Sequence, residues 1–418
     1  MAAAQSSTYK LLRDLWPQKA IYDELYKASP TLGMLKKDTS FYESHRFIDV
    51  GYGAPQGVGP DFGIAKAAKT ASKTAEFSIT PVSYYGMFSL SGRLMRQSKG
   101  DKAVIVKPLA RESRNVITQW KRDMSRYIFG NGGGALARMT SGSAPTTSAT
   151  VTLNDTNTNR AIEQGMTLQT SATDGTSGSV KSGSVTVASV VRNLDGNSTV
   201  TVDQATWAAG ISGPAASDYI FRAGAFGGVL TGFEGWNPAS DPTSTSFFGV
   251  DRTPDVQRLG GLRIACAGKT PREAALRSAR MVADVGGTPD TYILSTTDWE
   301  SLQLELQSAG TLKYAQVPSS PIGKFNFGLK YDAIQLMGPV GPISVVSDAD
   351  ATVGVGRMLS LDTWTLASTG ELVSIIEGGA GPGGMMMEES SDAFESRLVG
   401  DFQLYCEAPG LNGRVALT

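Results

Sequence analysis

The longest regular pattern of apolar residues runs from Pro108 to Phe129, where they recur at steps of three and four. This spacing predicts a long amphipathic helix, and the following "GNGGG" predicts its end. The apolar stripe needs a sheet to cover, although a core helix of any α+β domain has the same pattern. The stripe consists of Leu109, Val116, Ile117, Trp120, Met124, Tyr127 and Ile128, with Arg111, Arg114, Lys121 and Arg122 on other faces.

Strand-like alternation before this helix, in residues 45–50 and 76–91, predicts a long hairpin. The stretch between them, "GYGAPQGVGPDFGIAKAAKTASK", is rich in Gly, Ala and Lys. In a compact monomer, a connection of about 25 residues without its own core would be ordered at a cost in entropy and would bury nothing. We therefore expect this loop to lie on a neighbouring subunit.

The N-terminal residues 8–36 mix helical spacing with Pro17 and Pro30. Proline interrupts helices because it lacks a backbone N–H group. We expect short helical pieces in an extended arm rather than a packed domain.

Residues 135–225 hold few charges, many Ser, Thr and Gly, and short runs such as "ATVTL", "GSVTVASVV" and "STVTVD". Turn residues separate these runs, which predicts a small all-β module of several strands. Its glycine-rich ends and self-contained pattern predict an inserted, outward-facing domain.

Gly268, Lys269 and Thr270 repeat the last letters of a phosphate-binding loop, but Arg263 stands where that motif needs its first glycine. The same letters fit a capping box, with Thr270 as the N-cap and Glu273 at the third helical position. We favour the capping box, since the turn-forming glycine is missing. The helix is expected to bury Ala274, Leu276, Ala279, the Arg280 stem and Val282.

The remaining sequence alternates strands and helices. "TYILS", "AIQLM" and "ISVVS" read as strands and "TTDWESLQLELQ" as a helix, which predicts an α/β region. The chain closes with the alternating segment "FESRLVGDFQLYCEAPGLNGRVAL".

Composition is ordinary for a folded protein: 418 residues, 41% hydrophobic and 18% charged. No apolar run approaches the ~18 residues of a membrane span, and the first residues lack an apolar signal core, so we expect a protein made and used inside a cell. Cys266 and Cys406 lie in no metal-ligand spacing and are expected to be small core residues.

Residues able to perform catalysis are few. His45 is the only histidine, which excludes a two-histidine metal site, and we interpret it as a strand-edge residue. No G-x-S-x-G sequence occurs. Glu388 and Glu389 follow a glycine-rich stretch that reads as a mobile loop. We predict no catalytic residue, no cofactor-binding residue and no metal ligand, and hence no enzyme.

Charge is unevenly distributed along the chain. Residues 1–130 hold 20 Lys and Arg against 11 Asp and Glu, whereas residues 131–418 hold 18 against 28. The two ends can pair within a monomer or between subunits. Nucleic-acid binding is a third interpretation, although no basic cluster is interleaved with aromatic residues. Lys66, Lys69 and Lys73, called below the hairpin lysines, are expected either to meet acidic groups of an adjacent subunit or to lie in a solvated loop.

This order of parts resembles the major capsid proteins of tailed bacteriophages, the Hong Kong 97-type fold. The resemblance covers nearly the whole chain and includes "SYYGMFSLSGRLM", "PDTYILSTTDWESLQ" and "DAFESRLVGDFQLYCEAPG". It implies an α+β fold with an N-terminal arm (1–40), an extended hairpin loop (41–92), a peripheral domain with a spine helix (93–134), an inserted β-rich domain (135–225), a peripheral return (226–260), an axial domain (261–380) and closing peripheral strands (381–418).

The function implied by the resemblance is a structural subunit that assembles as hexamers and pentamers into an icosahedral shell around double-stranded DNA. Its implied partners are further copies, a separate scaffolding protein, a portal protein, optionally a decoration protein, and DNA contacted non-specifically, with no membrane. Its implied location is the virion, assembled in the host cytoplasm. An isopeptide bond to asparagine is known in this family, but no local motif selects one of the hairpin lysines as the amine. Two alternatives remain: a cellular nanocompartment shell, and a hydrolase or adhesin with a β-sandwich binding module.

Overall fold

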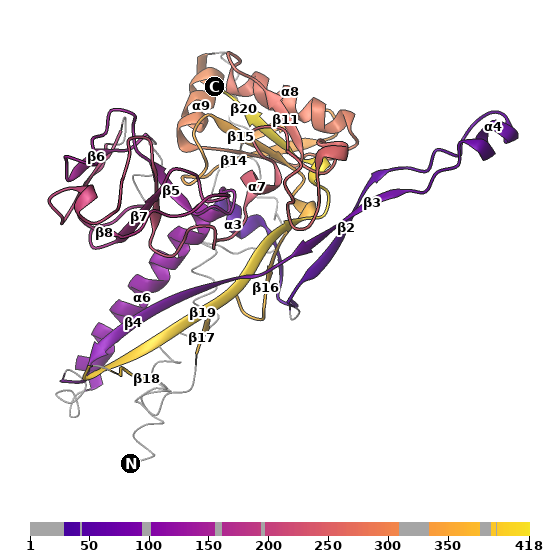
Figure 1. The fold of residues 1–418 in the computed structure, drawn as a ribbon. Helices are drawn as coiled ribbons and strands as arrows, with labels where there is room; N and C mark the ends of the chain where they lie inside the picture. The colour runs from indigo at the N-terminus through magenta and orange to yellow at the C-terminus, as the bar shows by residue number, and fades with distance from the viewer. Residues whose placement is uncertain are drawn as a thin grey trace.

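The computed structural model describes residues 29–41, 44–93, 102–154, 161–193, 197–308, 334–376, 386–389 and 391–418. The described chain forms three packed bodies (Figure 1). They are a long sheet with a long helix running along it, a β-barrel, and an α/β body. Each has its own hydrophobic core. A two-stranded hairpin projects from them.

The long sheet is built on two long strands, β4 (Val82–Ser91) and β19 (Ala393–Cys406). They pair antiparallel along the whole of β4. The helix α6 (Lys102–Tyr127) runs along this pair (Figure 1), and its Trp120 is 2% exposed. The sheet is completed by β1 (Lys36–Asp38), β16 (Trp364–Ser368), β17 (Ser374–Ile375) and β18 (Met386–Met387).

The second body is a small closed barrel. After β5, the backbone N–H of Thr140 donates to the carbonyl of Thr152 at 2.9 Å, and Asn154 donates to Arg138 at 2.7 Å, which joins the two edges of a six-stranded sheet. Closure removes the unpaired strand edges at which open sheets aggregate. Trp207 fills the interior, where its indole N–H donates to the Ala149 carbonyl at 2.9 Å. The strands are β5 (Ala135–Arg138), β6 (Thr150–Thr152), β7 (Thr167–Ser171), β8 (Val185–Val191), β9 (Thr199–Val202) and β10 (Tyr219–Arg222).

The α/β body is a mixed sheet covered by two helices that pack on each other, α8 (Pro271–Asp284) and α9 (Thr296–Ser308). Thr270 caps α8, because its hydroxyl accepts the backbone N–H of Glu273 at 3.3 Å. The capping-box interpretation of Thr270 as N-cap is therefore confirmed. In order across the sheet, the strands are β11 (Leu262–Ala265), β20 (Gly413–Ala416), β15 (Val355–Leu359), β12 (Thr291–Leu294), β14 (Pro342–Ser347) and β13 (Ile334–Met337).

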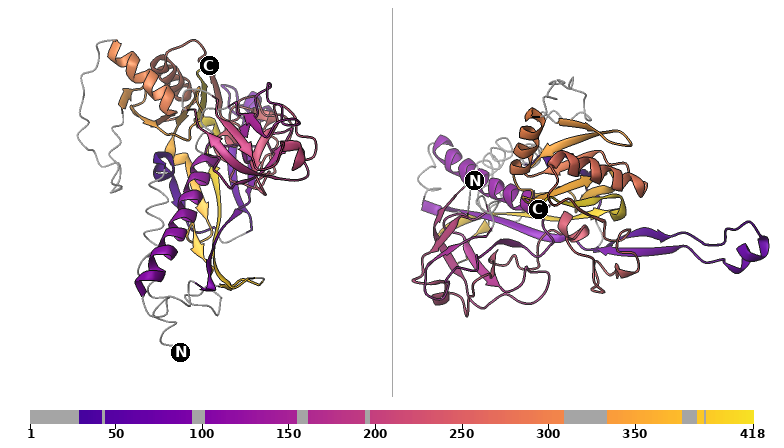
Figure 2. Two further views of the ribbon diagram at one scale, coloured as in Figure 1. Left: turned by 90° about the vertical axis from the view of Figure 1, so that its left-hand side faces the viewer. Right: turned by 90° about the horizontal axis from the view of Figure 1, so that it is seen from above.

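The hairpin consists of β2 (Arg46–Gly53) and β3 (Lys73–Ile79), which pair only with each other, and of a short helix at the tip, α4 (Phe62–Ala67). Seen from above, it extends well beyond the three bodies (Figure 2). Short helices complete the described chain: α3 (Pro30–Met34), α7 (Phe233–Trp236), η2 (Trp207–Ala209), η3 (Thr253–Asp255), η4 (Leu361–Thr363) and η6 (Pro409–Leu411).

Several sequence predictions need correction at the hairpin and the long helix. The predicted second strand, 76–91, is two strands, β3 and β4, separated at Pro81. Only β3 pairs with β2, whereas β4 belongs to the long sheet. The helix begins at Lys102 rather than Pro108. Lys121, expected on an outer face, is buried. Side chains before Asn115 in this helix, including Leu109, Arg111 and Arg114, lie outside the described part.

Two predicted boundaries were also wrong. The predicted axial range 261–380 contains β16 and β17, which pair with β19 in the long sheet. The predicted closing strands of the peripheral domain (381–418) contain β20, which pairs with β11 and β15 in the α/β sheet. Alternation marks a strand but does not say which sheet it joins, because its partners are distant in sequence.

Burial differs from prediction in two further places. In α8, Leu276 and Arg280 are exposed, whereas Ala274, Ala279 and Val282 are buried as expected. Part of the predicted arm, residues 1–28, lies outside the described residues. From Ser29 onward it is packed: Leu32 is fully buried, and β1 pairs with β16.

Candidate assembly surfaces

The hairpin tip is a small folded element with no core of its own. Asp61 caps α4 by accepting the backbone N–H of Ile64 at 3.0 Å, and Thr70 accepts the backbone N–H of Gln56 at 3.0 Å across the tip. No residue of α4 is buried. The tip is therefore shaped by local hydrogen bonds rather than by packing.

Large apolar side chains gather at this tip and point into solvent. Val58 is 86% exposed, Phe62 83% and Ile64 63%. A single exposed apolar residue is unremarkable, but a cluster on a projecting element is typical of an interaction site. These side chains were not predicted from the sequence, where the loop was described only by its Gly, Ala and Lys content. The signal that could have found them is "DFGIAK", an N-cap Asp followed by a helical turn.

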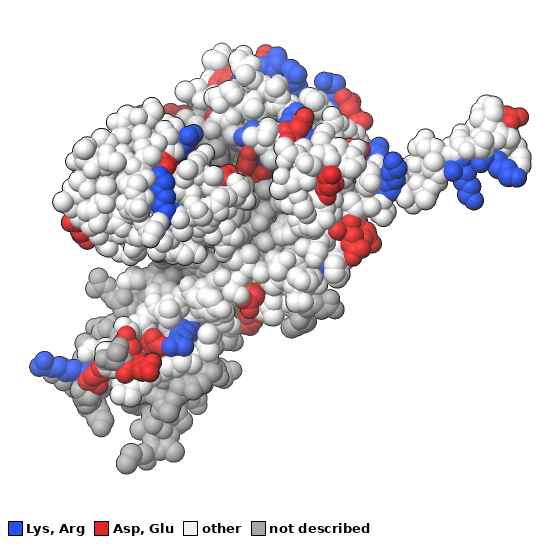
Figure 3. Space-filling view, viewed as in Figure 1, with Lys and Arg blue, Asp and Glu red and all other residues white. Residues whose placement is uncertain are grey.

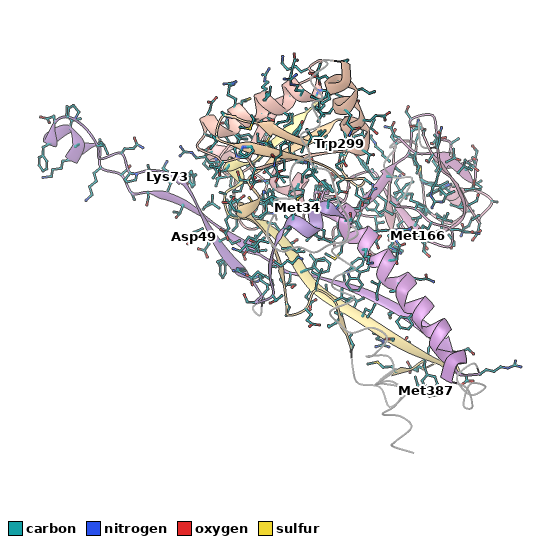
Figure 4. All side chains as sticks on the ribbon, turned by 180° about the vertical axis from the view of Figure 1, so that it is seen from behind. Met34, Asp49, Lys73, Met166, Trp299 and Met387 are labelled. Atoms are coloured by element: carbon teal, nitrogen blue, oxygen red, sulfur yellow. The ribbon has the colours of Figure 1, made fainter. Side chains whose placement is uncertain are left out.

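All three hairpin lysines are exposed: Lys66 and Lys69 lie at the tip, and Lys73 lies at the start of β3. The space-filling view shows their blue side chains on the projecting hairpin (Figure 3), and from behind Lys73 lies farther out along the hairpin than Asp49 (Figure 4). Within the described residues, no ion pair involves a hairpin lysine. The tip therefore combines apolar and positive side chains that the described part of its own chain leaves unmatched.

Acidic side chains gather at the opposite end of the molecule, around β18 (Figure 3). There β18 pairs with the start of β19, Met386 opposite Glu395, and the connecting turn holds Glu388, Glu389 and Asp392. Glu395 pairs with Arg397 on its own strand, and the Ser391 hydroxyl donates to Glu388 at 2.6 Å. The basic tip and the acidic turn are thus far apart. The two halves of the sequence are not separated in the same way, because Arg93, exposed just after β4, lies at the acidic end, where Ser91 pairs with Ala393.

The barrel is fastened to the long helix by a buried cluster of polar groups. Asp123 of α6 accepts hydrogen bonds from Arg222 of β10, from the Tyr84 hydroxyl of β4, and from Gln119 at 3.0 Å. Burial raises the pKa of Asp123, against the attraction of the Arg222 charge. Since this cluster joins all three elements, the barrel sits in a defined orientation on the helix rather than on a loose tether.

A second buried cluster joins the α/β body to the long-sheet core. Glu234 of α7 pairs with Arg357 of β15, which is 2% exposed, and with the Arg414 Nε of β20 at 3.0 Å. Burial alone would raise the pKa of Glu234, but the charges of Arg357 and Arg414 outweigh it and hold that pKa below its ordinary value. The two bodies are thus linked through one carboxylate.

The described N-terminal segment is anchored on the α/β body by Asp348, just beyond β14. Its carboxylate accepts hydrogen bonds from the Ser29 hydroxyl and, at 2.7 Å, from the Thr31 hydroxyl. Nearby, the Ser125 hydroxyl of α6 donates to Asp350 at 2.5 Å. The segment before β1 is therefore fixed where it joins the body.

The residues considered for chemistry from sequence do not converge. His45 lies just before β2, and Gly268 and Lys269 lie in the turn before α8. Cys406 is fully buried, and burial raises the pKa of its thiol to about 12. Cys266 is also buried, as expected of a core residue. Glu388 and Glu389 lie at the acidic end described above, on the turn after β18.

Two kinds of feature are absent from the described residues. These residues contain no group of three or more His, Cys, Asp or Glu side chains arranged to hold a metal ion. None of their helices combines the length and apolar character needed to cross a membrane.

Comparison with known proteins gives structural likeness without sequence likeness. No family model and no curated protein sequence matches the chain. It is similar to a chain of the cyanophage A-1(L) capsid asymmetric unit, with 14% identity, a TM-score of 0.49, and coverage of 93% of this chain and 92% of that chain. It is similar to a capsid chain of a native GTA particle, with 10% identity, a TM-score of 0.45, and coverage of 94% and 90%. It is also similar to a capsid chain of Myoviridae phage XM1, with 9% identity, a TM-score of 0.40, and coverage of 92% and 90%.

Proposed function

We propose that this protein is the major capsid subunit of a tailed bacteriophage, a structural protein without enzymatic activity that assembles into an icosahedral shell around the viral DNA. The observation that carries the proposal is the hairpin tip: no residue of α4 is buried, and Val58, Phe62 and Ile64 are presented to solvent. The base of the hairpin packs on the body through Phe77 and Ile79, which are fully buried, whereas the exposed apolar tip has no such packing and is typical of an interaction site. A second copy of the chain provides that packing.

Magnitudes indicate which part of the tip dominates the contact. Full burial of a Val, Ile or Phe side chain contributes about 1.5–3 kcal/mol, whereas an exposed ion pair contributes ~0–1 kcal/mol. The three apolar side chains therefore provide most of the contact free energy. The hairpin lysines adjust it and make it depend on salt.

The arrangement of the two ends favours a head-to-tail contact. The basic, apolar tip lies at one end of the molecule and the acidic turn at β18 at the other (Figure 3). Two different surfaces that meet form a heterologous interface, which closes into rings when the rotation between copies permits. Hexamers and pentamers are such rings, and we propose that the tip of each subunit reaches toward the acidic end of the next.

The other partners follow from the same role. We propose that a separate scaffolding protein guides assembly, that DNA enters through a portal protein, and that the shell contacts the packaged DNA non-specifically. We further propose that the barrel faces outward, where a decoration protein can reach it. A nanocompartment shell has the same subunit design, and identification of the enclosed cargo distinguishes the two.

Assembly and the tip are tested together by a charge-preserving variant. Phe62→Ser combined with Ile64→Ser removes tip apolar surface that is exposed in the monomer, so the circular dichroism and melting temperature of the subunit should not change. Electron microscopy and sedimentation should show shells for the parent and a large loss of shells for the variant. If the parent stays monomeric under all assembly conditions, the proposed function is wrong. If both proteins form shells equally well, the tip is not the contact.

A further inference from the structure

The hairpin changes direction at a β-bulge where it leaves the body. Gly51 pairs with Thr74 and Gly53 with Lys73, so Tyr52 has no residue opposite it in β3. A bulge bends the strand and increases its twist, and therefore changes the direction of the hairpin residues beyond it. Arg258, which belongs to the body, donates a hydrogen bond from its Nη1 to the Tyr52 carbonyl at 2.6 Å.

Arg258 is itself held in place by the short helix η3. Its backbone N–H donates to the Asp255 carboxylate at 2.9 Å, and its Nε lies 3.8 Å from the same carboxylate. The guanidinium thus joins a fixed turn of the body to the one irregular position of β2. The hydrogen bond spans 206 residues of sequence, and local sequence patterns do not predict it.

A second contact holds the other strand. Phe248 and Gly249 form a two-residue turn, closed by hydrogen bonds of 2.9 and 3.0 Å between Phe247 and Val250, and Phe248 has a φ of +47°. Asn, Asp or Gly is preferred at this position, so a phenylalanine there is strained and is retained only where its surroundings require it. Its ring stacks on Trp236 at 5.7 Å, and its carbonyl accepts the Ser78 N–H of β3 at 2.8 Å.

One side of the hairpin base faces open space. A cleft of about 730 Å³ separates it from the α/β body, lined by Val50 and Gly51 of β2, by Gln257 and Arg258, and by Val285 after α8. Packing therefore does not stop the hairpin from moving toward that side. The Arg258 hydrogen bond lies at the edge of this cleft.

We propose that Arg258 and Phe248 are positioning residues for assembly, which set the direction in which the hairpin leaves the body and hence the angle between neighbouring subunits. The inference rests on the proposed function. The hairpin acts as a lever: the ten residue-to-residue steps from Tyr52 to Phe62 span roughly 33 Å when extended, so a swing of about 10° at the bulge moves the tip by about 6 Å. A displacement of that size changes which groups of a neighbour the tip meets.

The test compares Arg258→Ala and Arg258→Lys with the matched control Arg280→Ala. Arg280 is exposed on α8, and its partner is Asp284 at 2.8 Å, so the control removes an arginine and an ion pair without touching the hairpin. Two readouts are used: backbone amide hydrogen exchange of the dissociated subunit, and electron microscopy of assembled particles.

For Arg258→Ala we expect amide exchange at residues 51–54 and 73–76 to be roughly three- to tenfold faster, the effect of losing one hydrogen bond. Exchange elsewhere should stay as in the parent, and the particles should vary in diameter or require more protein to form. Lysine, which retains one donor, should give an intermediate result, and Arg280→Ala should match the parent. Phe248→Asn, which fits the turn but lacks the ring, should also broaden the particle diameters.

The outcomes separate the two proposals. Parental exchange at the hairpin base together with parental particles in Arg258→Ala overturns the positioning role while leaving the capsid function intact. Absence of particles from the parent overturns the capsid function, and the exchange measurement still decides whether Arg258 holds the hairpin.

Discussion

Trp120→Ala is expected to weaken the long-sheet body more than any other single truncation in α6. The indole is 2% exposed and lies edge-on to the Tyr84 ring at 5.1 Å. It packs on two glycines of neighbouring strands: a Cβ added at Gly86 would lie 3.1 Å from the indole, and one added at Gly400 would lie 3.0 Å from it. The two strands thus lack side chains where the ring lies, and alanine at position 120 leaves an unfilled space.

The expected cost follows from this burial. A buried aromatic side chain covers about 150–250 Å², which at roughly 25 cal/mol per Å² corresponds to about 4–6 kcal/mol. Measured truncations of buried Phe or Trp to Ala cost about 3–5 kcal/mol. We expect a loss in the same range. Trp120→Phe should cost less, because it keeps a ring and removes an indole N–H that has no hydrogen-bond partner among the described residues.

Denaturant unfolding with hydrogen exchange as the local readout measures the effect. Exchange should accelerate in β4 and β19 and remain unchanged in the barrel, which has a separate core. Phe62→Ala is the control, since that ring is 83% exposed at the hairpin tip and its loss should leave unfolding unchanged. Equal stability of Trp120→Ala and the parent would refute the placement of this side chain between helix and sheet.

Three further predictions use other parts of the molecule. Changing the three hairpin lysines to glutamate should leave circular dichroism unchanged but shift shell formation in a salt-dependent way; assembly like the parent's at low and high salt would show that they form no clamp. Replacing 135–222 by a Gly/Ser linker removes Arg222, so it is combined with Asp123→Asn to avoid a buried carboxylate without its charge partner. This variant should leave a folded remainder, and complete insolubility would show that the barrel is part of the core of the remaining chain. Glu234→Gln should cost about 3–5 kcal/mol, because Arg357 stays buried without its charge partner. The parent should lose this contribution as pH falls below the ordinary Glu pKa of 4.5, since the folded pKa is lowered, and acid unfolding identical in parent and variant would contradict it.

Local patterns were sufficient for the parts whose residues interact with near neighbours. The stripe of Trp120 and Met124 predicted a helix against a sheet, and both are buried. Thr270 was recognised as the N-cap because its partner, the Glu273 backbone N–H, lies only three residues away. The β character of 135–225 was also predicted, since short alternating runs separated by turns carry that signal. Closure of this sheet into a barrel was not predicted, because it depends on the antiparallel bridge between Met139 and Leu153.

The features missed depend on contacts between distant residues. Asp123 and Arg222 are 99 positions apart, so the burial of this pair leaves no periodic trace in the sequence. The same applies to β20, whose alternation suits either sheet and whose true neighbours are β11 and β15. The basic character of the hairpin loop was found from the sequence. The apolar tip was missed, because the local sign of it is α4, a short helix with a single capping residue.

Electron microscopy of the purified protein over a range of salt, alone and together with its scaffolding protein, and with reconstruction where particles form, is the most direct test of the proposed capsid function. We expect closed shells of many copies in which each hairpin tip lies against a neighbouring subunit, with Val58, Phe62 and Ile64 covered. A protein that remains monomeric under every condition, or shells in which the tips stay in solvent, would contradict it.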